Sequence, residues 1–156
     1  MNLYNIGKIR SYLTVDQAKS VVHAYLKSKL DANNALLAGT TTELKSQLQR
    51  VQNAAAKLIT RNKKHDHVTP LLHDLHWLPI EDRIIFKVLL LAYKSLNDVG
   101  PVYLKDLQHF YKPPFNLRSA DESLKLIILR TKLSTYGDID LSVTSEVEWN
   151  KLPMQI

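Results

Sequence analysis

The sequence predicts a mainly α-helical fold: a bundle of about five or six helices, followed by a short and weakly specified tail with β character. Apolar residues recur every three or four positions in several long segments before residue 112. Threonine and proline stand where these segments begin, as they do at the starts of helices. After residue 112 the apolar spacing is lost, and prolines and β-branched residues take its place.

The first two helices are expected before residue 31. One helical face is predicted by the intervals of three and four between Leu3, Ile6, Ile9 and Leu13. Thr14 and Gln17 have the spacing of a capping box, so a second helix is predicted from Thr14 to about Leu30. Its apolar side would contain Val15, Ala18, Val22, Tyr25 and Leu26.

The clearest pattern predicts a helix from Thr42 to about Thr60. Its apolar stripe would consist of Leu44, Leu48, Val51, Ala55, Leu58 and Ile59. A second, polar stripe on nearly the opposite side would consist of Arg50, Asn53, Lys57, Arg61 and Lys64. Arg61 and Lys64 belong to this stripe only if the helix continues beyond Thr60. One face is therefore expected to pack, and the other to present cations.

Prolines mark the starts of further helices, because proline is tolerated in the first turn. These helices are predicted at residues 69–75, 80–96 and 102–110. In the helix at 80–96, Arg83, Lys87 and Lys94 share one narrow face and most other residues are apolar. A helix that is apolar on its remaining sides is predicted to be a buried central helix.

The tail reads differently. Residues 111–123 include two adjacent prolines and few apolar residues, which is typical of a linker or an extended arm. Residues 124–131 are a β-like apolar run, and residues 134–153 mix β-branched residues with turn residues. The tail is expected either to form a small hairpin or to be loosely attached.

Composition excludes several classes of protein. The chain has no cysteine, which rules out disulfides, thiol catalysis and zinc sites built on thiolates. No apolar run is long enough to cross a bilayer, and the first residues have no apolar signal core. We therefore expect no membrane partner and an intracellular location, nuclear or cytoplasmic.

The basic residues are unevenly distributed. Residues 1–64 contain 11 Lys and Arg against 3 Asp and Glu, whereas residues 65–156 contain 10 against 12. Such an asymmetry predicts a polyanionic partner for one end of the chain, and the alternative is an ordinary solvated basic surface. The candidates for contact with nucleic-acid phosphates are Arg50, Asn53, Lys57, Arg61, Lys63 and Lys64, with Lys8, Arg10, Lys27 and Lys29 nearby in sequence. Because this half has few aromatic residues, base stacking is not expected to be its main mode of binding.

Four histidines lie close together, at positions 65, 67, 73 and 76. A metal site is one interpretation, but the spacing is poor and no cysteine assists, so no metal or other cofactor is predicted. We expect His76, Trp77 and Pro79 to form a structural junction between helices, with His65 and His73 in solvent. No glycine-rich phosphate loop or nucleophile elbow is present, so no catalytic residue and no enzyme activity are assigned to this chain alone.

Several strings carry a family resemblance. In order they are LDANNALLAG, LKSQLQRVQNAAAKLIT, HVTPLLHDLHWLPIEDRIIFKVLLLAYKSLND, RTKLSTYGD and WNKLP. With these strings the chain, over essentially all of its length, resembles the region after the polymerase core in LINE-type (non-LTR) retrotransposon reverse transcriptases, most closely the chicken-repeat and jockey-related clades. The resemblance implies a thumb-like basic helical region at 1–64, a helical C-terminal extension at 65–112, and a linker with a β-like tail at 113–156.

The resemblance also implies a role. In this family the palm carries the catalytic aspartates, and nothing of the palm is present here. The chain would be a non-catalytic C-terminal fragment of an RNA-directed DNA polymerase that binds the backbone of RNA or an RNA–DNA template–primer in the full-length enzyme. The alternatives are a decayed open reading frame that yields an inert helical scaffold, and a helical protein-interaction module.

The chain departs from the family pattern at several positions. Asn33 replaces a usual cysteine, and Leu129 replaces a usual proline before Arg130. The residues before Trp149 include Glu146 and Glu148, where the family favours apolar residues. These departures leave the fold of residues 121–156 open and indicate a decayed copy of the element.

Overall fold

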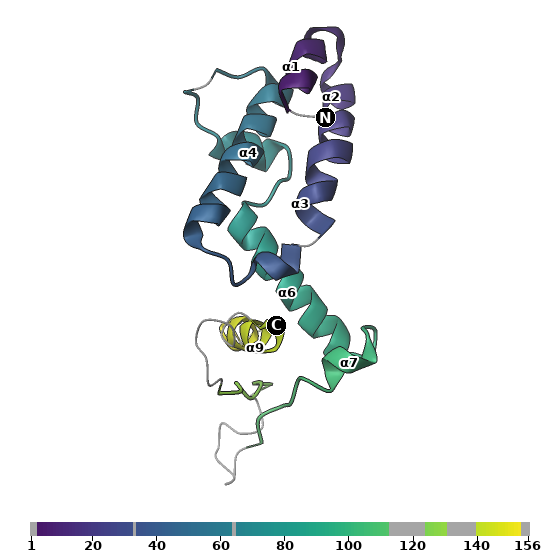
Figure 1. Cartoon of the computed structure of the whole chain (residues 1–156), viewed down its shortest axis with the longest axis vertical. Helices are drawn as coiled ribbons and strands as arrows, with labels where there is room; N and C mark the ends of the chain where they lie inside the picture. The colour runs from purple at the N-terminus through teal and green to yellow at the C-terminus, as the bar shows by residue number, and fades with distance from the viewer. Residues whose placement is uncertain (1–2, 33, 64, 113–123, 131–139, 154–156) are drawn as a thin grey trace. The chain divides into compact units, whose positions relative to one another are not determined.

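The computed structural model describes residues 3–32, 34–63, 65–112, 124–130 and 140–153. These residues are mainly α-helical, which confirms the predicted fold class (Figure 1). The chain divides into two compact units. Unit 1 consists of residues 1–34 and 41–83, and unit 2 consists of residues 35–40 and 84–156.

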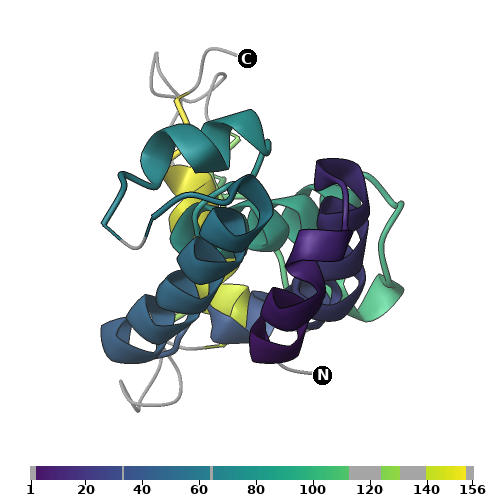
Figure 2. The ribbon, with the colours of Figure 1, turned by 90° about the horizontal axis from the view of Figure 1, so that it is seen from above.

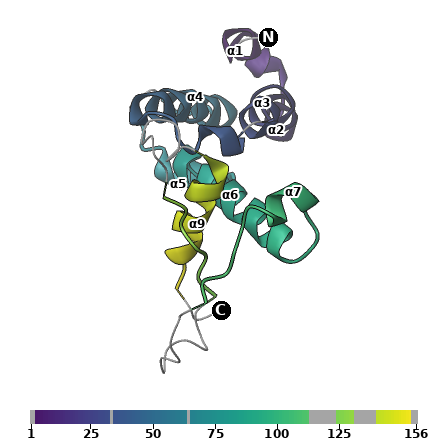
Figure 3. The same ribbon diagram turned by 60° about the horizontal axis from the view of Figure 1, so that its bottom comes forward.

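Unit 1 contains the N-terminal helices and the long basic helix. Its elements are α1 (Leu3–Ile9), the 3-10 turn η1 (Arg10–Tyr12), α2 (Val15–Val22), the π-helical turn η2 (His23–Lys27), α3 (Ser28–Ala32), α4 (Thr42–Thr60), α5 (Thr69–Asp74) and the first turn of α6 (Ile80–Leu96). The 3-10 turn η3 (Asn34–Leu37) begins at the edge of this unit. Helix α4 lies beside α2, and Figure 2 shows α1 in purple next to α4 in blue (Figures 2 and 3).

The predicted capping box at the start of α2 is confirmed. The Gln17 backbone N–H donates to Oγ1 of Thr14 over 3.3 Å, and the Thr14 N–H donates to Oε1 of Gln17 over 2.9 Å. These two bonds satisfy backbone donors that a helix start otherwise leaves unpaired. The helix continues to Ala32, slightly beyond the predicted Leu30, and widens into the π-helical turn η2 on the way.

Two apolar clusters form the core of unit 1. The first joins α1, α2 and α4 through Ile6, Val22, Ala55 and Ile59, all at most 1% exposed. The second joins α4 and α5 through Ala56, Leu71 and Leu72. Leu75 and Trp77 pack against both clusters and so connect them.

Helix α4 has the predicted bounds, Thr42–Thr60, but its buried face is rotated from the predicted one. The buried residues are Gln52, Ala55, Ala56 and Ile59. Leu44 and Val51, predicted in the packed stripe, are 39% and 37% exposed. The alanines allow neighbouring elements to approach closely. The buried Gln52 donates from its Nε2 to the Leu78 carbonyl oxygen over 2.8 Å, while its Oε1 has no hydrogen-bond partner.

Three helices end in the left-handed backbone conformation without using glycine. The residues concerned are Arg61 after α4 (φ 59°), His76 after α5 (φ 53°) and Asp98 after α6 (φ 60°). In each case the backbone N–H of the following residue donates to the carbonyl oxygen of the residue five positions before it. The donor–acceptor pairs are Asn62–Lys57, Trp77–Leu72 and Val99–Lys94. This is the Schellman arrangement, which ends a helix sharply. Helix α4 therefore ends at Thr60, and the condition under which Arg61 and Lys64 would extend its polar stripe is not met.

Helix α6 has the predicted bounds, Ile80–Leu96, but not the predicted environment. Within unit 1, Arg83 is buried and its Nη1 lies 2.9 Å from Oδ1 of Asp31. Within unit 2, Phe86 and Tyr93 are each 56% exposed, so the helix is not buried on its remaining sides. A helix with an exposed apolar side shows a nearly continuous apolar pattern, which sequence alone interprets as burial all round.

Unit 2 contains most of α6, the short helix α7 (Val102–Lys105), an extended segment at residues 124–130 and helix α9 (Leu141–Asn150). Helix α7 ends five residues before the predicted end at residue 110. Phe110 and Leu126 form a single antiparallel bridge, and the described part of the tail contains no strand. The linker predicted at 111–123 lies largely outside the described residues, as do residues 131–139.

The predicted β character at residues 141–150 is wrong, because these residues form α9. The buried face of α9 consists of Ser142, Val143, Ser145 and Glu146. Three of these four residues are polar, so the helical face leaves almost no apolar periodicity in the sequence. The β-branched residues of the segment then dominate a prediction based on composition.

Candidate nucleic-acid interface

The net positive charge belongs mostly to unit 1. Its residues include 12 Lys and Arg against 7 Asp and Glu, whereas unit 2 has 9 against 8. Two acidic side chains of unit 1 are engaged by cations that lie away from the predicted site. Asp31 pairs with Arg83 at 2.9 Å, and Asp16 pairs with Lys19 at 3.9 Å. No ion pair reaches Arg50 or Lys63 from the part of the chain that the structure describes.

The middle of the predicted site is a continuous helical face. Arg50, Asn53 and Lys57 lie at spacings of three and four on α4, which places them side by side. Arg50 is exposed, and Asn53 and Lys57 are half-buried. Oδ1 of Asn53 accepts from Nε2 of Gln49 over 2.8 Å, and Oε1 of Gln49 accepts from the Ile80 N–H over 2.8 Å. Asn53 thus orients the side chain that caps the start of α6.

The remaining predicted residues follow the end of α4. Arg61 is exposed, and its Nη2 donates to the Arg10 carbonyl oxygen over 3.3 Å. Lys63 is exposed, and its backbone N–H donates to Oδ2 of Asp66 over 2.7 Å. Lys64 lies outside the described residues. The structure therefore brings Arg50, Asn53 and Lys57 together on one face, and places Arg61 and Lys63 beyond the end of the helix.

Arg10 has a different role from the one predicted. It was expected among the phosphate-binding cations, but it is only 6% exposed. Its guanidinium donates to the carbonyl oxygens of Leu58 (2.9 Å), Ile59 (2.6 Å) and Leu13 (2.7 Å). The first two acceptors belong to the last turn of α4, where the helix dipole places partial negative charge. Arg10 therefore caps α4 and offsets that charge.

The predicted junction at His76, Trp77 and Pro79 is structural in a way that the sequence did not specify. Trp77 contacts both apolar clusters, and the Pro79 carbonyl oxygen accepts from the Arg83 N–H over 2.9 Å in the first turn of α6. The His76 side chain is exposed, so its contribution is the left-handed backbone that ends α5 rather than a packed imidazole. His65 and His73 are exposed, as predicted.

No metal-binding group of three or more His, Asp or Glu side chains occurs among the residues that the structure describes.

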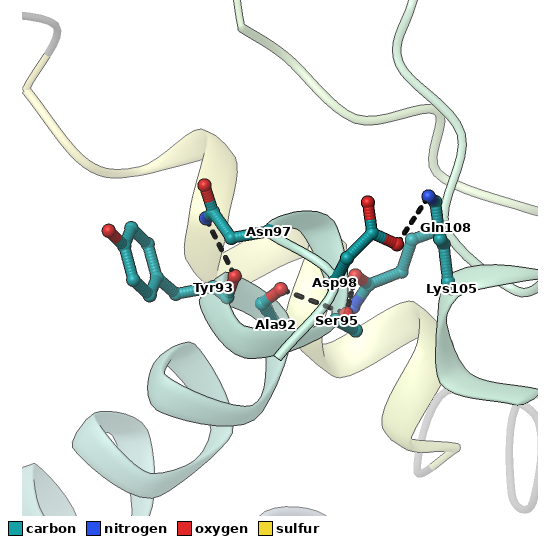
Figure 4. A network of polar contacts seen from close by, with 7 residues as sticks. All are labelled: Ala92, Tyr93, Ser95, Asn97, Asp98, Lys105 and Gln108. Atoms are coloured by element: carbon teal, nitrogen blue, oxygen red, sulfur yellow. Dashed lines mark hydrogen bonds and ion pairs between the residues drawn. The ribbon is translucent and has the colours of Figure 1, made fainter. Parts of the chain in front are cut away.

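A second polar cluster lies inside unit 2. The Ser95 hydroxyl, which donates to the Ala92 carbonyl over 2.9 Å, also contacts Oε1 of Gln108 (Figure 4). Nε2 of Gln108 donates to Oγ of Ser145 over 3.2 Å, which links α6 to α9. Lys105 and Asp98 form an ion pair of 2.5 Å at the same end of α6 (Figure 4). These bonds are internal to the unit and indicate a structural role.

Glu146 is the one carboxyl group in the described residues with a clear electrostatic perturbation. It is 1% exposed, and burial raises the pKa of its carboxyl group. The Leu129 N–H donates to its Oε2 over 3.2 Å and, with the charge of His109, opposes this increase in the pKa. Oε1 has no hydrogen-bond partner. In the sequence Glu146 is only one of two glutamates before Trp149, and no local signal distinguishes a buried glutamate from an exposed one.

No protein-family model, curated protein or solved structure matches the chain. None of the described helices is both long and apolar enough to cross a membrane.

Proposed function

We propose that this chain is a non-catalytic C-terminal part of a LINE-type reverse transcriptase, and that unit 1 binds the phosphate backbone of RNA or an RNA–DNA template–primer. The resemblance supplies the family, and the exposed cationic face of α4 supports the role. Arg50 is the residue on which the proposal depends most, since it is the exposed member of this face and pairs with no acidic side chain in the described residues. Cations of this kind contact phosphates without reading sequence.

The fold of unit 1 suits such a contact. Apolar clusters fix α4 against α1, α2 and α5, while its polar side stays accessible. A rigid helix presents its cations at fixed positions. Binding a nucleic-acid backbone therefore requires little loss of conformational entropy in the protein beyond the ordering of the cationic side chains. No residue is assigned a catalytic role, and no cofactor is required.

A pair of matched double variants tests the proposal. Arg50→Gln with Lys57→Gln removes two charges seven residues apart on α4. Lys87→Gln with Lys94→Gln removes two charges at the same spacing from α6, where both lysines are exposed. Affinity for an RNA–DNA duplex, measured by fluorescence anisotropy at one fixed salt concentration, is expected to fall about tenfold or more in the α4 variant and much less in the α6 variant.

The same comparison addresses the inert-scaffold alternative. A scaffold without a binding site would bind polyanions only through its net charge, so both double variants would lose the same affinity. Equal losses, or no loss in the α4 variant, would contradict the proposal. Near-identical thermal unfolding of the two variants would establish that neither loss reflects unfolding.

A second candidate function, a protein-interaction module, is favoured by one observation. Unit 2 exposes Val99, Val102 and Tyr103 by 73%, 76% and 66%. Exposed apolar residues that lie close together in a fold are typical of protein contacts. The candidate predicts self-association of the chain in sedimentation experiments, reversed by Val102→Glu. A concentration-independent monomer would exclude self-association through this surface.

A further inference from the structure

Tyr12 has an unusual position in the basic unit. Its side chain is 86% exposed, although it belongs to the short turn η1 between two helices. The turn itself is fixed, because the neighbouring Arg10 is buried and its guanidinium donates to three carbonyl oxygens. An aromatic ring on a fixed backbone can be used for contact at a lower entropic cost than a ring on a mobile loop.

Cations lie close to this turn although they are far away in sequence. Arg61 donates to the carbonyl oxygen of Arg10, only two residues before Tyr12. Arg61 is itself exposed, and Lys63 follows it. Because Arg10 satisfies the carbonyls at the end of α4, the partial negative charge of that helix end is offset. An exposed aromatic ring and exposed cations are therefore gathered where η1 meets the end of α4.

The surroundings of Tyr12 differ from those of Tyr4, an exposed tyrosine in α1. Tyr4 is 71% exposed, but the Lys8 ammonium lies 4.6 Å from the centre of its ring and covers one face. No cation–π contact occupies the ring of Tyr12 in the described part of the chain. The ring of Tyr12 is thus the better platform for a flat ligand.

We propose that unit 1 binds a single-stranded nucleotide beside the duplex backbone held by α4. The base of this nucleotide stacks on Tyr12, and the phosphates on either side of it contact Arg61 and Lys63. This inference rests on the proposed function, because it requires the same unit to bind nucleic acid. Stacking of a base on an aromatic ring tolerates any sequence, since every base has a π face. The ligand class is therefore a single-stranded end or overhang without sequence preference.

The test compares two single strands of equal length, oligothymidylate and an abasic strand with the same number of phosphates. The wild-type chain is expected to bind oligothymidylate about fivefold or more tightly than the abasic strand. Tyr12→Ala should bring this ratio close to one, whereas Tyr12→Phe, which keeps the ring, should preserve it. Tyr103→Ala removes an exposed tyrosine of unit 2 and should also preserve it.

Each result has one meaning. An affinity ratio near one for the wild-type chain, or a ratio unchanged in Tyr12→Ala, overturns the stacking proposal. If both strands still bind in a salt-dependent way, the proposed function is left intact. Absence of binding to both strands and to an RNA–DNA duplex overturns the proposed function and the stacking proposal together. If Tyr103→Ala also abolishes the preference for oligothymidylate, the preference is a general effect of exposed aromatic rings, and the proposed site at Tyr12 is overturned.

Discussion

Arg10 illustrates how a single side chain determines both the stability and the surface charge of unit 1. In the sequence it is one more cation in a basic segment, but in the structure it is buried and bonds the last turn of α4. The charge available for a ligand is therefore smaller than the count of Lys and Arg indicates. Nothing in the local sequence marks this role, because the acceptors are carbonyls from residues 48 and 49 positions away.

Arg10→Met should destabilise the chain. The substitution keeps an apolar stem but leaves two carbonyl oxygens at the end of α4 and that of Leu13 without their donor. Leaving buried polar groups unpaired costs about 3 kcal/mol in total, so the free energy of unfolding in urea should fall by roughly that amount. Lys29→Met, which removes one exposed cation from the same unit, is the control and should change it little. A similar free energy of unfolding for both variants would contradict the capping role.

Glu146 predicts a pH dependence. Burial raises the pKa of its carboxyl group, and Asp140 adds to the increase, while the Leu129 N–H and His109 oppose it. The folded chain thus binds this proton more tightly than the unfolded chain does. Its contribution to stability is fully present below the ordinary carboxyl pKa and is lost as the pH rises through the raised value.

Glu146→Gln should therefore raise the thermal unfolding midpoint at neutral pH. The gain over wild type should shrink as the pH falls through the raised pKa of Glu146 and be gone below the ordinary carboxyl pKa, because the wild-type side chain is then also neutral. Glu148→Gln is the comparison, since Glu148 pairs with Lys151 at 2.6 Å near the surface. An equal gain for Glu146→Gln at neutral and acidic pH would show that charge burial is not the cause.

At the scale of elements, the sequence predicts the features that depend on neighbouring residues, and it does not predict the features that depend on partners far away in the chain. The capping box at Thr14, Pro70 in the first turn of α5 and Pro79 before α6 all act within a few residues of a helix start, so sequence alone located these starts. The rotation of α4 and the helical state of α9 depend on partners elsewhere in the chain. Buried polar residues such as Gln52 and Ser145 carry no apolar signal, so periodicity could not identify them.

The end of α5 provides a prediction at this scale. His76 has a φ of 53°, a conformation that costs a residue with a side chain about 1 kcal/mol and costs glycine nothing. Because its side chain is exposed, His76→Gly should raise the free energy of unfolding by about that amount. His73→Gly, inside α5, should lower it by about 1 kcal/mol. Destabilisation by His76→Gly would mean that the imidazole contributes contacts to the junction.

At the scale of the whole chain, the sequence identified the basic half but not which cations remain available. Burial removes Arg10, and Asp31 engages Arg83, whereas Arg50 remains exposed. The division into a thumb-like region at 1–64, an extension at 65–112 and a tail at 113–156 is a functional one and stays a prediction. The assignment of polyanion binding to unit 1 is the central claim.

The most direct test is the salt dependence of binding to an RNA–DNA duplex with a single-stranded overhang, which offers phosphates to α4 and to the end of the helix alike. If Arg50, Lys57, Arg61 and Lys63 contact phosphates, the logarithm of the association constant should fall linearly with the logarithm of salt concentration, with a slope of about −0.9 for each phosphate engaged. Four such cations predict a slope of about −3 to −4. A slope near zero, or no binding at low salt, would contradict the assignment of a nucleic-acid interface to unit 1.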